Sequence, residues 1–272
     1  YQSVLKCMQY YRNRKTDPPY DGIYQKKLEA AFSSKMNGGF SIAVNSGSSA
    51  SYIAIKSLQL KKNEKILMSP VSDSSTLLSI ILAGLRPVIL DSSESTYNTD
   101  IDQIKKAWRR GIKAIYLVHS YGSLCADILR IKNFCDEKNI PLIEDCSQSP
   151  FAYLELEDGE RKYAGEFGHI SCFSTMYRKT FNTSSSGGIV FTRNEEYYRS
   201  AVEYSDRGRR KWNIESNLRD GGDVSTISHN FNTSELNCAS GISSLRRIDE
   251  AIEQRMMLVR YIIKNLSSQL YI

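Results

Sequence analysis

The sequence predicts an α/β protein in which a mostly parallel sheet of seven strands lies between helices. Between residues 41 and 192, short apolar segments alternate with longer amphipathic ones. Repeated strand–helix–strand units of this kind form parallel sheets with helices on both faces. The length of 272 residues also suits either one large domain or one domain with a small appendage.

The expected strands are short apolar runs that lie between polar or turn-forming residues. In chain order they cover residues 41–44, 65–68, 87–90, 114–118, 141–143, 170–173 and 188–192. Helices are expected where apolar residues recur every three or four positions. Examples are residues 50–60, 76–83, 101–108 and 126–139.

The two ends of the chain differ from this alternating region. Turn signals near Pro18 and Gly38, with a short helical pattern between them, predict an arm and one helix in residues 1–40. Residues 205–230 lack periodicity and are expected to form a long loop. Apolar residues from Leu245 to Leu266 recur at helical steps and predict one long amphipathic helix. Its apolar stripe requires a partner, either a small C-terminal domain or another subunit. The predicted division is therefore 1–40, 41–240 and 241–272.

Charge and composition argue against several classes of function. The net charge of +6 is not concentrated in a stripe, which disfavours nucleic-acid binding. The one basic cluster, residues 207–211, is expected to be a solvated loop or a contact for a phosphorylated substrate. No apolar run approaches the ~20 residues that cross a bilayer. The six cysteines and three histidines lack metal-ligand spacing, so we expect no metal and a reduced, cytoplasmic protein.

Three segments bear on chemistry. The first runs from Asn45 to Ala50, directly after an expected strand and at the start of an expected helix. Its small residues allow a ligand to approach the backbone, and the N–H groups with the hydroxyls of Ser48 and Ser49 suit a phosphate. Plain helix capping by serine and glycine is an equally good explanation of this segment alone.

The second segment, Ile140 to Gln148, ends an apolar strand with Glu144 and Asp145. Ligands of open α/β sheets bind at this end of the strands. Asp145 is a candidate partner for a protonated heterocyclic nitrogen, while Glu144 is expected to point to the opposite side. A helix-capping aspartate is the alternative.

The third segment places Lys179 in a turn after the expected strand 170–173, with Gly187 and Gly188 before the next strand. A lysine in such a turn is a candidate for forming a Schiff base. Most lysines are solvated surface groups, so the segment gains weight only in combination with the other two.

In chain order, these segments resemble the DegT/StrS-type nucleotide-sugar aminotransferases, fold-type I enzymes that use pyridoxal 5′-phosphate (PLP). The family pattern is an S-G-T-A loop, an apolar strand that ends in E-D-x-x-Q, then F-S-x-x-x-x-K and a double glycine. This sequence has Ser46-Gly47-Ser48-Ser49, Glu144-Asp145-Cys146-Ser147-Gln148, Phe173-Ser174 followed by Lys179, and Gly187-Gly188. The resemblance covers roughly residues 20–270. It implies a fold-type I large domain followed by the start of a C-terminal small domain.

The resemblance also implies roles for individual residues. Lys179 would form the Schiff base with PLP and then carry protons. Asp145 would pair with the pyridine nitrogen and keep it protonated, and Gln148 would orient the cofactor ring. The 5′-phosphate would be held by Ser48, Ser49 and Ser174.

A neighbouring subunit would also reach the phosphate, through an asparagine that matches Asn230. The resemblance therefore implies a homodimer with shared active sites. Three positions depart from the family pattern. Ser74 stands where relatives carry a ring-stacking aromatic residue, Ser186 stands in place of an acidic residue before the double glycine, and Asn232 stands in place of an arginine.

The implied function is PLP-dependent transfer of an amino group from a donor such as glutamate to a keto group of a nucleotide-linked sugar. An amino-cyclitol or aminobenzoate-forming relative would use the same PLP residues. The family's sugar dehydratases carry a histidine in place of the lysine, so Lys179 argues against that branch. A catalytically silent regulatory or binding protein on the same scaffold is the alternative from a different class, motivated by Ser74 and Ser186.

Overall fold

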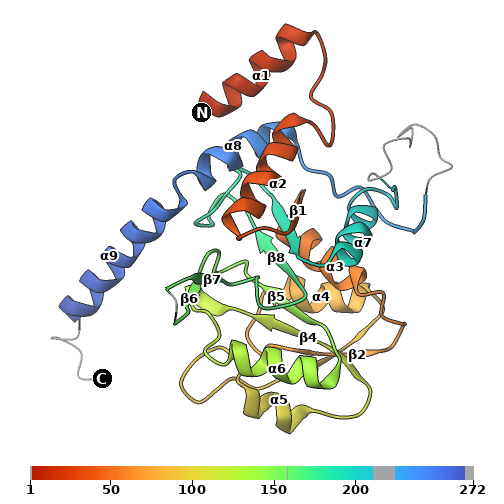
Figure 1. The fold of residues 1–272 in the computed structure, drawn as a ribbon, viewed down its shortest axis with the longest axis vertical. Coiled ribbons are helices and arrows are strands. Elements are labelled where there is room, and N and C mark those ends of the chain that lie inside the picture. The colour runs from red at the N-terminus through yellow and green to blue at the C-terminus, as the bar shows by residue number, and fades with distance from the viewer. Residues whose placement is uncertain (1, 158, 211–223, 267–272) are drawn as a thin grey trace.

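The computed structural model describes residues 2–157, 159–210 and 224–266 (Figure 1). The helices are α1 (Gln2–Arg14), α2 (Ile23–Lys35), α3 (Gly47–Ser57), α4 (Ser74–Leu82), α5 (Ile101–Ala107), α6 (Ile128–Lys138), α7 (Glu195–Ser205), α8 (Glu235–Leu245) and α9 (Ile248–Leu266), with a short 3-10 turn at Ser120–Gly122. The strands are β1 (Phe40–Val44), β2 (Lys65–Met68), β3 (Arg86–Ile89), β4 (Ile112–Val118), β5 (Leu142–Asp145), β6 (Tyr153–Glu155), β7 (Arg161–Tyr163), β8 (Ile170–Ser174) and β9 (Gly188–Thr192).

A seven-stranded sheet in the order β1-β9-β8-β5-β4-β2-β3 forms the centre of the molecule. Strand β9 is antiparallel to both of its neighbours, and the pairings from β8 to β3 are parallel. The predicted α/β class is confirmed, and each of the seven expected strands is present with bounds that differ by no more than two residues. Strands β6 and β7, which the sequence did not predict, form a separate two-stranded sheet.

Helices cover both faces of the sheet (Figure 1). Helices α3, α4 and α7 cover one face, where a buried apolar cluster includes Ile53, Ile80, Tyr116, Val190 and Ala201. On the other face, α5 and α6 pack over β2, β4 and β5, and α2 and α8 pack over β1, β8 and β9. Since successive strand residues point to opposite faces, Glu144 and Asp145 at the end of β5 lie toward different helical layers.

The structure corrects two expectations about the ends of the chain. The segment expected as an arm contains helix α1. This helix is held by a residue far away in the sequence, because Tyr11 donates a hydrogen bond of 2.5 Å to Glu235 of α8. The expected long C-terminal helix is broken, because the backbone turns at Arg246 and Arg247. Leu245 therefore belongs to α8, and α9 is a separate helix.

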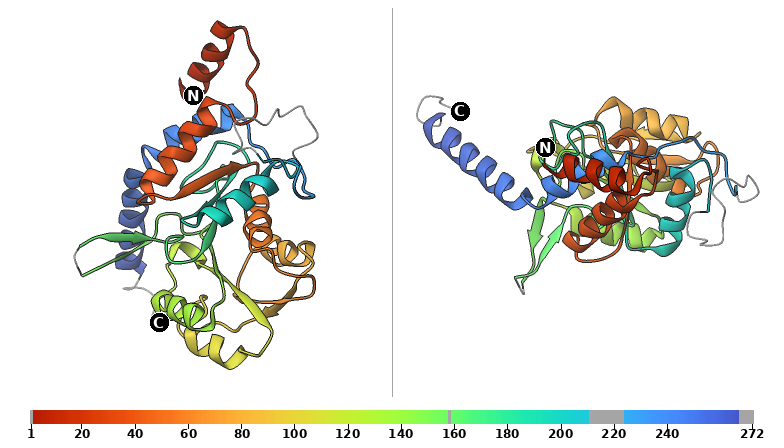
Figure 2. Two further views of the ribbon diagram at one scale, coloured as in Figure 1. Left: turned by 45° about the vertical axis from the view of Figure 1, so that its right-hand side comes forward. Right: turned by 90° about the horizontal axis from the view of Figure 1, so that it is seen from above.

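Helix α9 extends away from the sheet (Figure 1 and Figure 2). Its apolar side chains from Met256 onward are exposed. None of the helices in the described part of the chain is long and apolar enough to cross a membrane.

Candidate active site

The amino-terminal end of α3 lies directly after β1 and is built from small polar residues. The Ser46 hydroxyl caps the helix by accepting the N–H of Ser49 at 3.1 Å. The Ser49 hydroxyl donates to Asn45 Oδ1 at 2.6 Å and is therefore engaged within the loop. Ser48 is exposed, and in the first turn of a helix the N–H groups of Gly47 and Ser48 have no intrahelical acceptor. This end of α3 can therefore receive an anion.

Two glycines allow this loop to lie against the ends of β8 and β9. A Cβ atom at Gly47 would stand 2.7 Å from Cβ of Ser174, the last residue of β8. A Cβ atom at Gly188, the first residue of β9, would collide with the Ser46 carbonyl oxygen. Because neither glycine has a side chain, Ser174 can lie next to the α3 loop. Ser48, Ser49 and Ser174 must lie close together in this way if they are to hold one phosphate.

Asp145 ends β5 and is 6% exposed. Its Oδ1 accepts the N–H of Ser147 at 3.0 Å. Its Oδ2 accepts the hydroxyls of Thr76 at 3.2 Å and Tyr116 at 3.1 Å. The carboxylate is thus oriented by one backbone group and two hydroxyls, on the side of the sheet that α3 and α4 cover.

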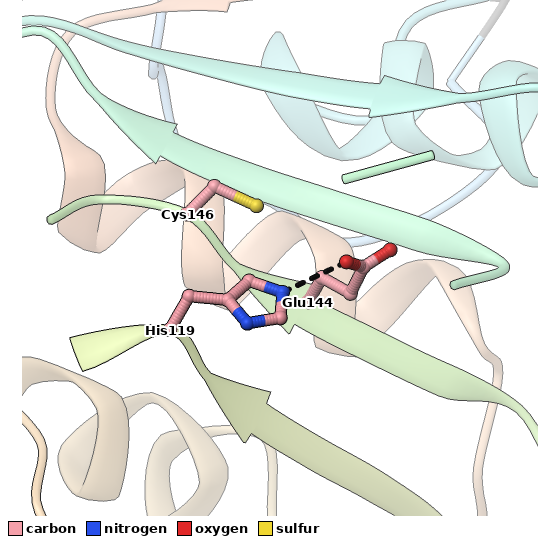
Figure 3. Close-up of side chains that lie close together, drawn as sticks. All are labelled: His119, Glu144 and Cys146. Atoms are coloured by element: carbon pink, nitrogen blue, oxygen red, sulfur yellow. Dashed lines mark hydrogen bonds and ion pairs between the residues drawn. The ribbon is translucent and has the colours of Figure 1, made fainter. Parts of the chain in front are cut away.

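Glu144 belongs to a separate buried network with His119 and Cys146, in which three potential metal-ligand atoms lie within 4.8 Å of one another (Figure 3). His119 Nδ1 accepts the N–H of Cys125, so the proton on Nε2 is donated to Glu144 Oε2 at 2.8 Å. The carboxylate also accepts the backbone N–H groups of Gly165 and Gly168.

Hydrogen bonds therefore account for this cluster without a metal ion. Burial also raises the pKa of Cys146 well above its usual value, which keeps the thiol protonated. Zinc-type ligation would require the thiolate and would compete with the existing hydrogen bonds of His119. The expected absence of a metal stays a prediction.

Lys179 lies in a turn after β8, where its N–H donates to the carbonyl of Met176 at 2.8 Å. Lys179 is partly buried. At the amino-terminal end of α4, hydrogen bonds from Ser75 and, to a smaller extent, the charge of Lys179 lower the pKa of Asp73. Because Thr76 of α4 also contacts Asp145, helix α4 connects the candidate lysine and the candidate aspartate.

The two remaining candidates lie on loops. Gln148 follows β5, and its side-chain oxygen accepts the N–H of Tyr121 at 2.9 Å. Asn230 is exposed, forms a β-bridge with Asp206 and accepts hydrogen bonds from Asn232 through Oδ1. The cofactor roles expected for both residues stay predictions.

The basic cluster expected at residues 207–211 is largely paired with acidic groups. Arg207 and Arg209 lie within ion-pair distance of Asp206, and Arg210 lies 3.7 Å from Glu203. Lys211 lies outside the described residues.

Sequence reasoning missed Thr76 and Tyr116, although both hydroxyls contact Asp145. Tyr116 offered a signal, since it is a hydroxyl-bearing residue within the otherwise apolar run of β4. Thr76 offered none, because its contact depends on how α4 packs on the sheet.

Comparison with known proteins agrees with the resemblance. The model of the DegT/DnrJ/EryC1/StrS aminotransferase family matches residues 13–271. GDP-perosamine synthase of Escherichia coli O157:H7 is 26% identical over 251 residues, which are 91% of this chain and 64% of that protein. The chain thus spans less than two thirds of the length of this relative.

Solved structures of similar fold include a sugar dehydratase and an aminotransferase. The GDP-4-keto-6-deoxy-D-mannose-3-dehydratase of Escherichia coli with bound hydrated PLP aligns with a TM-score of 0.84 at 25% identity. The alignment covers 98% of this chain and 70% of that one. An aminotransferase from Psychrobacter cryohalolentis aligns with a TM-score of 0.81 at 23% identity, over 92% of this chain and 62% of that one.

Proposed function

Because the chain belongs to the DegT/DnrJ/EryC1/StrS aminotransferase family, we propose that it binds PLP and transfers an amino group from an amino acid to a keto group of a nucleotide-linked sugar. The observation that supports this proposal is that Asp145 and Ser174 end neighbouring parallel strands, that Ser174 lies against the α3 loop, and that Lys179 follows in the turn after β8. When bound, PLP supplies an electron sink for a carbanion at the carbon that carries the amine.

The residues of this edge suit PLP. Gly47 and Gly188 leave the backbone open where a phosphate would bind, and the end of α3 favours negative charge there. Ser48 and Ser174 would add hydroxyl donors. Ser49 has its hydroxyl engaged with Asn45, so its role would be limited to the backbone and to shaping the loop.

Asp145 would hold a protonated ring nitrogen, since it is the last residue of β5 and three hydrogen bonds orient its carboxylate. Gln148, on the loop that follows, would orient the ring. Lys179 would bind the cofactor covalently through its amine and, once released by the amino donor, take and return the proton at the reacting carbon.

A second copy of the chain is the proposed partner, with Asn230 of one copy serving the phosphate of the other. The exposure of Asn230 supports this reading. The proposed substrates, a nucleotide-linked keto sugar and an amino acid, rest on the relatives named as sugar-modifying enzymes. The six cysteines are free and buried, which supports a cytoplasmic location.

The decisive experiment is addition of PLP to purified protein, followed by borohydride. Wild-type protein is expected to gain visible absorbance and, after reduction, to carry the cofactor permanently on Lys179. Lys179→Ala should lose both signals and keep the wild-type unfolding curve. Lys132→Ala, which removes a partly exposed lysine paired with Asp136 on α6, is the matched control and should behave as wild type. Wild-type protein that stays colourless and unlabelled contradicts the proposal.

Addition of glutamate then separates transamination from a silent regulatory role. Ser74 and Ser186 motivate the regulatory alternative, since both depart from the family pattern at the active site. Loss of the visible absorbance on adding glutamate, with release of 2-oxoglutarate, supports transamination. Stable absorbance with every amino donor tried favours the regulatory protein.

A further inference from the structure

Tyr116 stands out among the buried residues because its hydroxyl meets polar groups from three different elements. It lies in β4 and its side chain is fully buried. The hydroxyl lies 2.8 Å from Ser51 Oγ of α3, 3.2 Å from Cys172 Sγ of β8 and 3.1 Å from Asp145 Oδ2 of β5. Such a group would be costly to bury without these partners.

The direction of its hydrogen bond follows from the chemistry of the three partners. A tyrosine hydroxyl carries one proton, and the Asp145 carboxylate can only accept. Ser51 and Cys172 can each donate to the Tyr116 oxygen. Every group is therefore satisfied when Tyr116 donates to Asp145. Burial, and then the charge of Asp145, raise the pKa of Tyr116 well above its usual value, so the proton stays on the hydroxyl.

This arrangement connects two parts of the proposed cofactor site. Ser51 lies about one turn along α3 from Ser48, which belongs to the proposed phosphate site. From Ser51 the contacts continue through Tyr116 to Asp145. Thr76 of α4, which is also buried, donates to the same carboxylate oxygen.

We propose that Tyr116 is a positioning residue, which aims the Asp145 carboxylate at the ring nitrogen of the cofactor by donating a hydrogen bond to Oδ2. The inference rests on the proposed function. Tyr116, in the middle of β4, would influence the cofactor only through its hydrogen bond to Asp145. A purely structural tyrosine would affect every ligand of the site equally, whereas a positioning residue affects only ligands that carry the ring nitrogen.

The test compares two ligands on purified protein: PLP, and its analogue in which a C–H group replaces the ring nitrogen. The ratio of the two affinities isolates the contact with Asp145, because the phosphate and the covalent bond are the same in both. Tyr116→Phe is expected to weaken PLP binding about tenfold while the analogue binds as before, since a hydrogen bond to a charged group is lost. An equal loss for both ligands, or no loss for either, overturns the inference.

A double-mutant cycle with Asp145→Asn tests whether Tyr116 acts through this residue. In the Asp145→Asn background, Tyr116→Phe should change PLP affinity less than about twofold, because the two losses are not independent. Additive losses contradict the inference. Tyr52→Phe is the matched control. Tyr52 follows Ser51 in α3 and its ring packs on Phe231, so the loss of its hydroxyl should leave the affinity ratio unchanged.

Ser51→Ala keeps the test informative if Tyr116→Phe unfolds. It removes a donor to the Tyr116 oxygen but spares the bond to Asp145, so the affinity ratio should change less than about twofold. A tenfold change in that ratio would contradict the inference. Wild-type protein that does not bind PLP contradicts the proposed function, whereas wild-type binding with an unchanged Tyr116→Phe ratio contradicts the inference alone.

Discussion

Glu144 and Asp145 are adjacent in the sequence and buried at the same end of β5, but they face different surroundings. Each carboxylate accepts three hydrogen bonds. Glu144 is 0% exposed and receives them from an imidazole and two backbone N–H groups. Asp145 is 6% exposed, and two of its three donors are side-chain hydroxyls.

The difference shows how one strand end can serve both the fold and a binding site. Backbone N–H groups can only donate hydrogen bonds. The donors around Glu144 are therefore satisfied only by an acceptor such as a carboxylate or a carbonyl oxygen. Hydroxyls can rotate and either donate or accept, so the surroundings of Asp145 can adapt when its charge is shared with a ligand. This contrast supports the proposal that Glu144 serves the fold and that Asp145 serves the chemistry.

The largest expected effect comes from Glu144→Gln. Whichever way the new amide turns, its NH2 group meets a donor from the backbone or from His119, and a buried donor is left without an acceptor. We expect a loss of about 3 kcal/mol in the free energy of unfolding. Urea denaturation followed by circular dichroism measures it. A loss below about 1 kcal/mol would show that Glu144 is not needed by the fold.

Asp145→Asn is the matched substitution on the other side of the strand. Thr76 and Tyr116 can turn their hydroxyls to accept from the new NH2 group, and Ser147 keeps its acceptor. We expect the free energy of unfolding to change by no more than about 1 kcal/mol. The affinity for PLP should instead fall about tenfold to a hundredfold, measured by absorbance titration. If Asp145→Asn unfolds as readily as Glu144→Gln, the contrast between the two carboxylates is wrong.

The sequence predicted the sheet well because most of its strands, apart from the edge strand β3, are buried on both faces and read as nearly continuous apolar runs. Helix α1 was missed because only Cys7 and Tyr11 of its thirteen residues are buried. Its position depends instead on Tyr11 and Glu235, which are 224 residues apart in the sequence. The break before α9 was missed because Leu245 and Ile248 continue the apolar stripe across the turn.

The site was predictable to the extent that it depends on local pattern. Alternation along β5 placed Glu144 and Asp145 on opposite faces, as the structure has them. The partners of each carboxylate were not predictable. Tyr116 meets Asp145 because β4 and β5 are neighbours in register, and His119 meets Glu144 for the same reason. Strand order is a long-range property that no single segment reveals.

The smallest expected effect concerns His169, which lies before β8 on a surface near the Glu144 network. Its Nδ1 accepts the N–H of Leu142 at 2.9 Å, so the neutral ring is required for this bond. Burial, and then the charge of Lys132, lower the pKa of His169 below its usual value of 6.5, while Asp136 and Glu144 oppose the shift.

The sign of the pH effect follows from this shift. The unfolded chain binds the proton more tightly, so the contribution of His169 to stability is present above about pH 6.5 and is lost as the pH falls through the lowered pKa. We expect wild-type protein to lose up to about 1 kcal/mol more between pH 7.5 and 5.5 than His169→Asn, whose side chain can accept a hydrogen bond without titrating in this range. Urea unfolding at both values measures the difference, and His229→Gln, at an exposed histidine, is the control. An equal loss in wild type and His169→Asn would mean that folding does not lower the pKa of His169 enough to change the free energy of unfolding in this pH range.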